Sequence, residues 1–376
     1  MSSSPLPIRA LPPAVVSRLR GAVVLPSLAG AVSELLQNAL DAGATQLDLT
    51  VNPSRPSIAL ADNGHGIHPD YVGAVGTPYA TSKHPPDGRY FGSRGEALSA
   101  LAQHSILTVT SRSRGCAVAG SRQCRWSYGE RVFEGPAPEH AALAEPGTTV
   151  RVDGLWGDMP VRLKARQGLD VERQWNQLNR TVVALLVSGR ADGVGVVVRD
   201  EIGTRRLAVR GRPALPPPPP DRPWDLAVLR QALGVDIVGS SADWVDVEAR
   251  LNSIRIEGWI SSKGSGSTAV QFLCVNGFPL MSRETELHRE VNRVFAASGF
   301  GTVDDADDRG LARIGAGARK GVDRKGMFVL RIECQTPDGM GLLGGEGGTE
   351  GKAGVEGEVS FSWNRSASSR SAAGWS

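Results

Sequence analysis

A run of five prolines, Pro216–Pro220, lies just past the middle of this 376-residue chain. Proline fixes φ and has no backbone N–H, so such a run cannot form part of a helix or a central strand. We therefore expect an extended connector over residues 212–223. It would separate a first domain, 1–211, from a second domain, 224–336. A long loop within a single domain is the alternative.

The end of the chain has the composition of a disordered tail. Glycine is nearly every second residue from Gly339 to Gly357, and Ser366–Ser376 is rich in serine, arginine and alanine. Such segments bury too little apolar surface to offset the entropy of ordering them. We therefore predict that residues 337–376 are disordered.

The overall composition is that of a soluble globular protein, with 40% hydrophobic and 22% charged residues. The net charge of +3 is small, so a nucleic acid could be bound only by a local basic patch. The N-terminal sequence lacks the apolar segment of a secretory signal, and the most apolar run, Val182–Val187, is too short to span a bilayer. The four cysteines show no C-x-x-C spacing. We expect a soluble intracellular protein with no membrane partner.

Hydrophobic periodicity predicts an α+β fold. Helices are expected over Leu28–Ala42 and Val171–Ser188 in the first domain, and over Leu226–Leu233 and Glu284–Ala297 in the second. Neighbouring strands in the first domain favour an antiparallel or mixed sheet with helices on one face. The strands expected along the chain are Leu47–Val51, Ser57–Ala61, Ser105–Ser111, Thr148–Val152, Ser253–Ile260, Gln271–Val275 and Met327–Glu333.

The first predicted helix carries a polar stripe. Glu34, Asn38 and Asp41 are spaced so that they share one helical face. A carboxamide oxygen at Asn38 could bind Mg²⁺, and the carboxylate of Glu34 could orient and deprotonate a water molecule. An ordinary solvated helix face is the alternative for this motif taken alone.

Two glycine-containing segments suit a nucleotide. Asp62 follows a predicted strand, and Gly64 and Gly66 would let the backbone approach a planar ligand while Asp62 accepts an exocyclic amine. In the second segment, a glycine-rich turn precedes a helical run beginning at Glu96, and free N–H groups at such a turn bind anions. This segment supplies Thr81, Ser82, Lys83, Gly92, Arg94 and Gly95. The P-loop motif G-x-x-x-x-G-K-[ST] is absent from the sequence.

With Gly147-Thr148-Thr149-Val150 as a fourth element, the order of these motifs resembles the nucleotide site of the GHKL ATPases. The amino-acid sequences of these motifs are similar to those of MutL, the mismatch-repair ATPase. The segments that carry this resemblance are ELLQNALDAGAT, DNGHGI, YATSK, SRGEALSAL, GTTVRV and Met159-Pro160-Val161-Arg162. Cys274-Val275-Asn276-Gly277 similarly matches a strand of the second MutL domain.

The resemblance implies a Bergerat-type α/β sandwich with a mixed sheet, followed by a smaller transducer domain like ribosomal protein S5. It implies that Glu34 is the general base for ATP hydrolysis and that Asn38 completes the Mg²⁺ shell. It further implies that Asp62 binds the adenine amine, with Thr148 near the same ring. The complete set of implied ATP-binding residues is Asn38, Asp62, Gly64, Gly66, Thr81, Ser82, Lys83, Gly92, Arg94, Gly95, Glu96, Ala97, Leu98 and Thr148.

Within MutL, the likeness is closest to the third eukaryotic paralogue, MutL homologue 3, because Arg20–Val24 and Ser33 differ from the segments usual in the others. This implies a nuclear protein that pairs with MutL homologue 1 and closes on DNA with ATP, in mismatch repair and meiotic recombination. The D-Q-H-A-x-x-E type of endonuclease motif is absent, so we expect the N-terminal half only and no nicking activity.

Two departures from the family suggest an alternative function. Ser93 stands where MutL proteins generally have phenylalanine. The family also places a lysine against the γ-phosphate shortly after the strand predicted at Met327–Glu333, where this chain becomes glycine-rich and offers only Lys352. The alternative is an ATP-binding but catalytically weak clamp or scaffold subunit for a MutL partner.

The contact with DNA is expected to be independent of sequence and to use basic side chains. The candidates are Arg162, Lys164, Arg319 and Lys320. The last two follow an acidic stretch, Asp304–Asp308, in a charged loop for which an ordinary solvated loop is the alternative.

Overall fold

The computed structural model describes residues 16, 21, 23–83, 90–92, 94–114, 120–166, 168–212, 224–251, 253–297, 325–334 and 360–362. The chain forms two compact units: Met1–Leu186 with Arg190–Trp224, and Val187–Gly189 with Asp225–Ser376. The predicted connector apart from Arg212, the candidates Arg319 and Lys320 of the charged loop, Ser93 and all but three residues of the predicted tail lie outside the described residues.

The first unit contains an eight-stranded sheet with the order β5-β4-β3-β6-β2-β1-β7-β8. Only β1 and β7 pair in parallel, which confirms the predicted mixed sheet. The strands are β1 (Gln46–Asn52), β2 (Ser57–Asp62), β3 (Ile106–Arg112), β4 (Arg122–Ser127), β5 (Glu130–Pro136), β6 (Gly147–Asp153), β7 (Gly195–Arg199) and β8 (Arg205–Val209).

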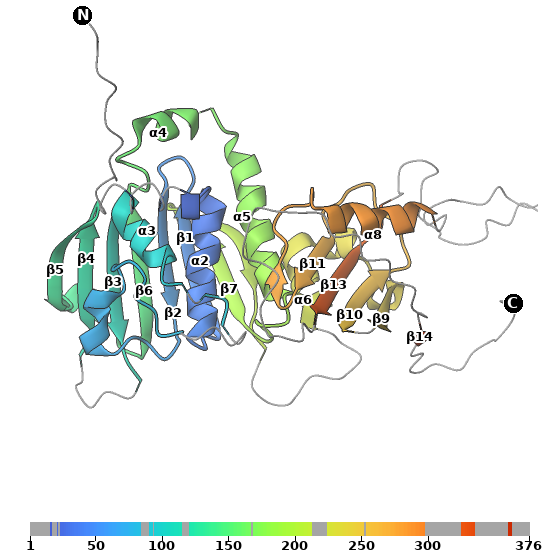
Figure 1. The fold of residues 1–376 in the computed structure, drawn as a ribbon, viewed down its shortest axis with the longest axis horizontal. Coiled ribbons are helices and arrows are strands. Elements are labelled where there is room, and N and C mark those ends of the chain that lie inside the picture. Colours follow the sequence, from blue (N-terminus) through green and yellow to red (C-terminus); the bar gives the residue numbers. More distant parts are fainter. Residues whose placement is uncertain are drawn as a thin grey trace, which may run out of the picture. The chain divides into compact units, whose positions relative to one another are not determined.

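Helices cover one face of this sheet. Leu47, Leu49 and Val51 alternate with more exposed residues along β1, so the sheet has one buried face. Figure 1 shows α2, α3 and α5 on that side, with α4 beyond the ends of the strands. The α-helices are α2 (Leu28–Asp41), α3 (Ala97–His104), α4 (Pro160–Arg166) and α5 (Val171–Leu186), with short 3₁₀ helices at Pro69–Ala74 and Glu139–Ala141.

The helix that carries the polar stripe is capped at both ends. The Ser27 hydroxyl accepts a hydrogen bond from the Gly30 N–H at 3.0 Å, which satisfies one of the free donors at the N-terminus of α2. At the other end, Gly43 has φ +69° and its N–H bonds to the Leu40 carbonyl. The helix therefore ends at Asp41, one residue before the predicted end.

The second unit contains a six-stranded sheet with the order β12-β11-β13-β10-β9-β14. One buried cluster consists of Leu273, Phe328 and Leu330, on which Leu287 and Phe295 of α8 pack. The elements are α6 (Trp224–Leu233), α7 (Val235–Val238), a 3₁₀ helix (Ser241–Asp243), β9 (Trp244–Leu251), β10 (Ile254–Ser261), β11 (Gln271–Val275), β12 (Phe278–Pro279), α8 (Glu286–Ala297), β13 (Phe328–Cys334) and β14 (Ser360–Ser362).

Within the predicted tail, residues 337–376, the structure describes one short strand, β14. Ser360–Ser362 pairs antiparallel with β9. Without β14, β9 would be the edge of the sheet, and an edge strand presents unpaired N–H and C=O groups that bind another strand. Composition alone does not reveal such a partner.

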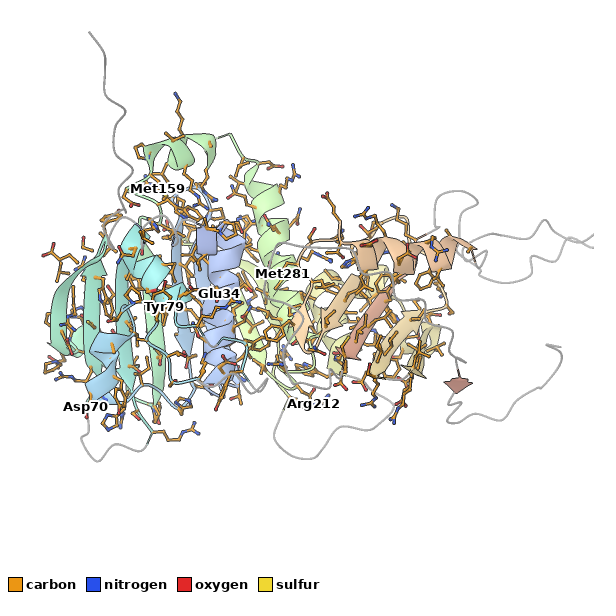
Figure 2. The ribbon with its side chains drawn as sticks, in the orientation of Figure 1. Glu34, Asp70, Tyr79, Met159, Arg212 and Met281 are labelled. Atoms are coloured by element: carbon orange, nitrogen blue, oxygen red, sulfur yellow. The ribbon has the colours of Figure 1, made fainter. Side chains whose placement is uncertain are left out.

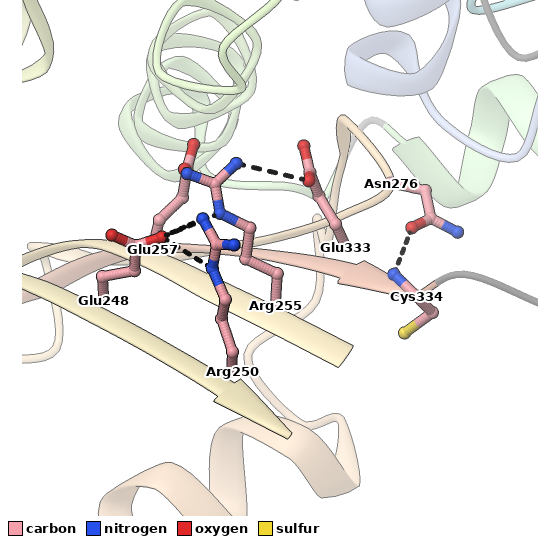
Figure 3. Close-up of polar contacts among 7 residues, drawn as sticks. All are labelled: Glu248, Arg250, Arg255, Glu257, Asn276, Glu333 and Cys334. Carbon is pink, nitrogen blue, oxygen red and sulfur yellow. Dashed lines mark hydrogen bonds and ion pairs between the residues drawn. The ribbon is translucent and has the colours of Figure 1, made fainter. Parts of the chain in front are cut away.

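The Asn276-Gly277 pair noted in the sequence forms the turn of a two-residue hairpin between β11 and β12. Both residues have positive φ, +50° and +79°, which such a turn requires and which asparagine and glycine tolerate best. The Asn276 side chain also accepts a hydrogen bond from the Cys334 N–H at 2.8 Å (Figure 3). The motif therefore fixes the end of β13 against this hairpin.

The charged side chains of β9, β10 and β13 neutralise each other. Glu248 bonds to both Arg250 and Arg255, while Arg255 also pairs with Glu257 and Glu333 (Figure 3). The arginines of this cluster are paired with glutamates, so the cluster has little free positive charge with which to bind a phosphate. Among the described residues, no helix is both long and apolar enough to cross a bilayer.

Candidate nucleotide site

The structure brings the polar stripe of α2 together with Lys83. The Lys83 Nζ donates to Asn38 Oδ1 at 2.9 Å and to Asp41 Oδ2 at 2.5 Å. Glu34 lies on the same helix (Figure 2), and its carboxylate interacts electrostatically with Lys83, Asp41 and Glu96. The stripe is therefore not a solvated helix face, which was the alternative that the sequence left open.

Burial changes the pKa of the Glu34 carboxyl. Desolvation raises the pKa of its carboxyl above the usual 4.5, the charge on Lys83 opposes this shift, and Asp41 and Glu96 reinforce it. A raised pKa makes a carboxylate a stronger base, and a base works best when its pKa lies near the working pH. Glu34 thus has the environment of a general base.

Asp62 is the last residue of β2. Burial raises the pKa of its carboxyl to about 6, against hydrogen bonds from the backbone N–H groups of Gly64 and Thr148. The Gly64 bond measures 2.9 Å. A half-buried carboxylate with spare acceptor capacity can bind an amine of a planar ligand.

The loop after β2 is fixed to the end of α2. The His65 N–H donates to the Ala42 carbonyl at 2.9 Å, and Asn63 Oδ1 accepts from the N–H groups of Thr45 and Gln46. This network holds the Asp62 loop beside the helix terminus that carries Asn38. These bonds connect the Asp62 loop to the end of the helix that carries the other predicted motif.

Two glycines allow close backbone contacts around the Asp62 loop. A Cβ at Gly66, which has φ +71°, would lie 2.1 Å from the Arg112 carbonyl oxygen. A Cβ at Gly147 would lie 2.1 Å from the Asp62 carbonyl oxygen. Neither contact is possible for a residue with a side chain, so these two positions require glycine.

Ser111 contacts both Thr148 and the Asp62 loop, and the sequence analysis did not predict this role. Its hydroxyl lies 2.9 Å from the Thr148 hydroxyl and accepts from the Ile67 N–H at 2.8 Å. It thereby joins β3, β6 and the Asp62 loop. No motif marks this position, because a serine at the end of a strand is common and only strand pairing places it opposite Thr148.

The glycine-rich turn lies before α3, as predicted. Gly95 has φ +64°, and its carbonyl accepts from the Tyr79 N–H at 3.2 Å. A Cβ at Gly95 would lie 2.4 Å from the Ala80 carbonyl oxygen, so glycine is needed here too. The helix begins at Ala97 rather than Glu96, which leaves Glu96 as its N-cap. Thr81, Ser82 and Arg94 are exposed, whereas Ala97 and Leu98 are half-buried.

Only one of the four predicted DNA contacts has an exposed side chain in the described structure. Arg162 donates to the Leu25 carbonyl at 2.6 Å and stacks 4.3 Å above the buried Trp156 ring, and burial lowers the pKa of its guanidinium. It therefore holds α4 in place. Lys164 is exposed on α4, and Arg319 and Lys320 lie outside the described residues.

The residues present suit Mg²⁺ bound together with phosphates. The Asn38 side-chain oxygen already accepts from a cation, the Lys83 ammonium, and such oxygens are the ligands that Mg²⁺ prefers. The described residues contain no cluster of three or more His, Cys, Asp or Glu that could hold a metal ion. A Mg²⁺ ion here would take most of its ligands from phosphate and water.

Sequence comparison identifies relatives of this chain. Residues 26–139 match the family described as histidine kinase-, DNA gyrase B- and HSP90-like ATPases. The DNA mismatch repair protein MutL of Paramagnetospirillum magneticum is 30% identical over 286 residues, which make up 73% of this chain and 43% of that protein. MutL of Rippkaea orientalis is 41% identical over 170 residues, 43% of this chain and 28% of the relative. The chain thus spans less than half the length of these curated relatives.

Solved structures share the fold. The N-terminal domain of a DNA repair protein superposes with a TM-score of 0.60 at 20% identity, covering 86% of this chain and 90% of that one. The ADP complex of the Aquifex aeolicus MutL ATPase domain gives 0.53 at 17%, covering 83% and 93%. The gyrase B subunit of Myxococcus xanthus gives 0.51 at 15%, covering 86% of each chain.

Fold and sequence together define a GHKL-type ATPase domain followed by a second, smaller α/β unit. Within that class, the chain is similar in sequence to the MutL family of DNA mismatch repair proteins.

Proposed function

We propose that this chain binds ATP and hydrolyses it with Mg²⁺, as the ATPase region of a MutL-type DNA mismatch repair protein. The observation that carries the proposal is the cluster of Glu34 and Asn38 on α2 with Lys83 from a separate loop, together with the hydrogen bond between the end of that helix and the Asp62 loop. In this proposal Glu34 is the base, Asn38 the metal ligand and Lys83 a phosphate-binding cation.

Each group has a role in this proposal. Asp62 accepts the exocyclic amine of adenine, with the Thr148 hydroxyl beside it. Lys83 and the turn that ends at Gly95 contact the phosphates, together with Thr81, Ser82 and Arg94. Glu34 orients a water molecule and removes its proton. Mg²⁺, when bound next to Asn38, would supply positive charge to the phosphates.

Removal of the base separates binding from hydrolysis. In Glu34→Ala, we expect ATP to bind with nearly unchanged affinity, because the adenine and phosphate contacts remain. Hydrolysis should fall roughly 10²–10⁴-fold, because the proton acceptor is lost. Asn38→Ala and Asp62→Asn should lose ATP binding instead. Calorimetry and a single-turnover ATPase assay at high protein concentration measure the two effects.

Glu172→Ala is the matched control, because Glu172 is an exposed glutamate on another helix, where it pairs with Arg206. It should leave both binding and hydrolysis unchanged. Undiminished hydrolysis in Glu34→Ala would refute the assignment of the base.

One sequence feature favours the alternative, a weakly catalytic clamp or scaffold subunit. The strand β13 ends at Cys334, and the following sequence is glycine-rich where the family has its phosphate-binding lysine. The single-turnover assay distinguishes the two functions: ATP binding with no measurable hydrolysis in the unaltered protein would favour the scaffold.

We also propose that the chain acts on DNA with a MutL-type partner. The exposed Lys164 supports a phosphate contact, which would be sensitive to salt. The likeness to MutL homologue 3, pairing with MutL homologue 1, a meiotic role and nuclear location rest on the sequence resemblance and stay predictions. Duplex-DNA affinity that does not change with salt concentration would contradict the phosphate contact.

A further inference from the structure

The Asp41 carboxylate accepts three hydrogen bonds from two parts of the predicted phosphate-binding segment, Gly76–Leu98. One donor is the Lys83 ammonium, at 2.5 Å, and the others are the N–H groups of Phe91 and Gly92, at 2.9 and 3.3 Å. The Asp41 side chain is only 3% exposed. Hydrogen bonds to a buried carboxylate are about twice as strong as neutral ones, so this carboxylate holds its donors firmly.

Further contacts surround the same group. Arg190 lies near enough to Asp41 to interact electrostatically, and its guanidinium carbon is 5.0 Å from the centre of the Phe91 ring. A Cβ at Gly92 would lie only 3.8 Å from the Lys83 Nζ, so the backbone at Gly92 passes close to the ammonium. Lys83 is shared with Asn38, the predicted Mg²⁺ ligand.

We infer that Asp41 is a positioning residue of the ATP site, which fixes Lys83 beside Asn38 and holds the backbone at Phe91 and Gly92 against the end of α2. Asp41 acts through these groups and does not itself contact the nucleotide. The inference depends on the proposed ATP site for its effect on nucleotide binding, but the arrangement itself can be tested without nucleotide.

Amide hydrogen exchange in the nucleotide-free chain tests the arrangement. In Asp41→Asn the charged acceptor is lost, so exchange at Phe91 and Gly92 should accelerate roughly 10- to 100-fold, with no change in β1 and β2. Asp192→Asn is the control, because Asp192 is an exposed aspartate that pairs with Arg212. Unchanged exchange at Phe91 and Gly92, or equal acceleration throughout the domain, would overturn the inference.

Lys83→Met provides a second variant in case Asp41→Asn does not fold. It removes the ammonium and leaves the carboxylate, so Phe91 and Gly92 should keep their slow exchange. Acceleration at these two amides in Lys83→Met would show that the ammonium, and not Asp41, holds them, and would overturn the inference.

Nucleotide affinities test the consequence for the site. Asp41→Asn should weaken ATP binding at least about 10-fold. The affinity for AMP should stay unchanged, because Asp62, which binds the adenine amine in the proposed site, is not altered. A merely structural role would weaken both equally and would contradict the inference. If the unaltered protein bound no ATP, the proposed function would fail, whereas the exchange result would still decide the role of Asp41.

Discussion

Burial gives the Asp62 carboxyl a pKa of about 6, above the usual value of 3.8. Between about pH 4 and pH 6 the folded protein therefore binds more protons at this residue than the unfolded chain does. The contribution of Asp62 to stability falls as the pH rises through this window. At neutral pH, where this carboxyl is ionised, its burial therefore lowers the stability of the fold.

Asp62→Asn tests this cost, because asparagine keeps the shape and has no proton to lose. The unfolding free energy of the variant, relative to the unaltered protein, should rise from about pH 4 to pH 6 by on the order of 2–3 kcal/mol and then stay constant. Urea denaturation without nucleotide measures it. Asp70→Asn, at an exposed aspartate, controls for the change of residue type, and a pH-independent difference for Asp62→Asn would contradict the account.

At the scale of elements, α2 is the helix that positions the site. It presents buried residues to the sheet and Glu34, Asn38 and Asp41 to the nucleotide region. Its direction depends on its two ends, because the Ser27 cap fixes where it begins and the turn at Gly43 leads directly into β1. A change at either end should therefore act on the whole site.

Ser27→Ala removes the N-cap acceptor for the Gly30 N–H. We expect the first unit to lose about 1 kcal/mol of unfolding free energy, since an N-cap hydroxyl contributes about this much. Chemical denaturation followed by circular dichroism measures it. Ser27→Asp keeps an acceptor and should retain most of the stability, so equal losses in both variants would rule out the cap as the cause.

At the scale of the whole molecule, the chain contains two units that each bury their own core. In the second unit, Arg331 of β13 donates to both carboxylate oxygens of Asp225 on α6, at 2.5 and 2.6 Å, and to the Val187 carbonyl. The Asp225 side chain is only 5% exposed, so this ion pair is largely removed from water. It joins the beginning of the unit to its central sheet.

Asp225→Ala should lower the unfolding free energy of the second unit by about 3 kcal/mol, because Arg331 is left without its buried partner. The unfolding of the first unit should not change. Calorimetry combined with hydrogen exchange assigns the transitions to the units. Glu248→Ala, in the exposed network of Figure 3, should have only a small effect. Equal shifts of both transitions in Asp225→Ala would show that the units unfold together.

Local patterns in the sequence were sufficient for much of the fold. The predicted β1, β2, β3 and β6 agree with the structure to within one residue at each end, because alternation of apolar residues is typical of a half-buried strand. The predicted β11 agrees at both ends, because a short continuous apolar run is typical of a strand buried on both faces. β5 was missed because nearly all its residues are exposed and carry no such alternation. β14 was missed because its pairing partner, β9, is more than a hundred residues away in the sequence.

The sequence by itself determined which residue types the site uses, since the spacing of Glu34 and Asn38 and the glycines near Asp62 follow from local geometry. Only the tertiary structure decided the partners. It placed Lys83 on Asp41, Ser111 opposite Thr148, and Arg162 on Trp156 instead of on the surface. The physical reason is that burial and hydrogen bonding depend on segments far apart in the chain, which no local pattern contains.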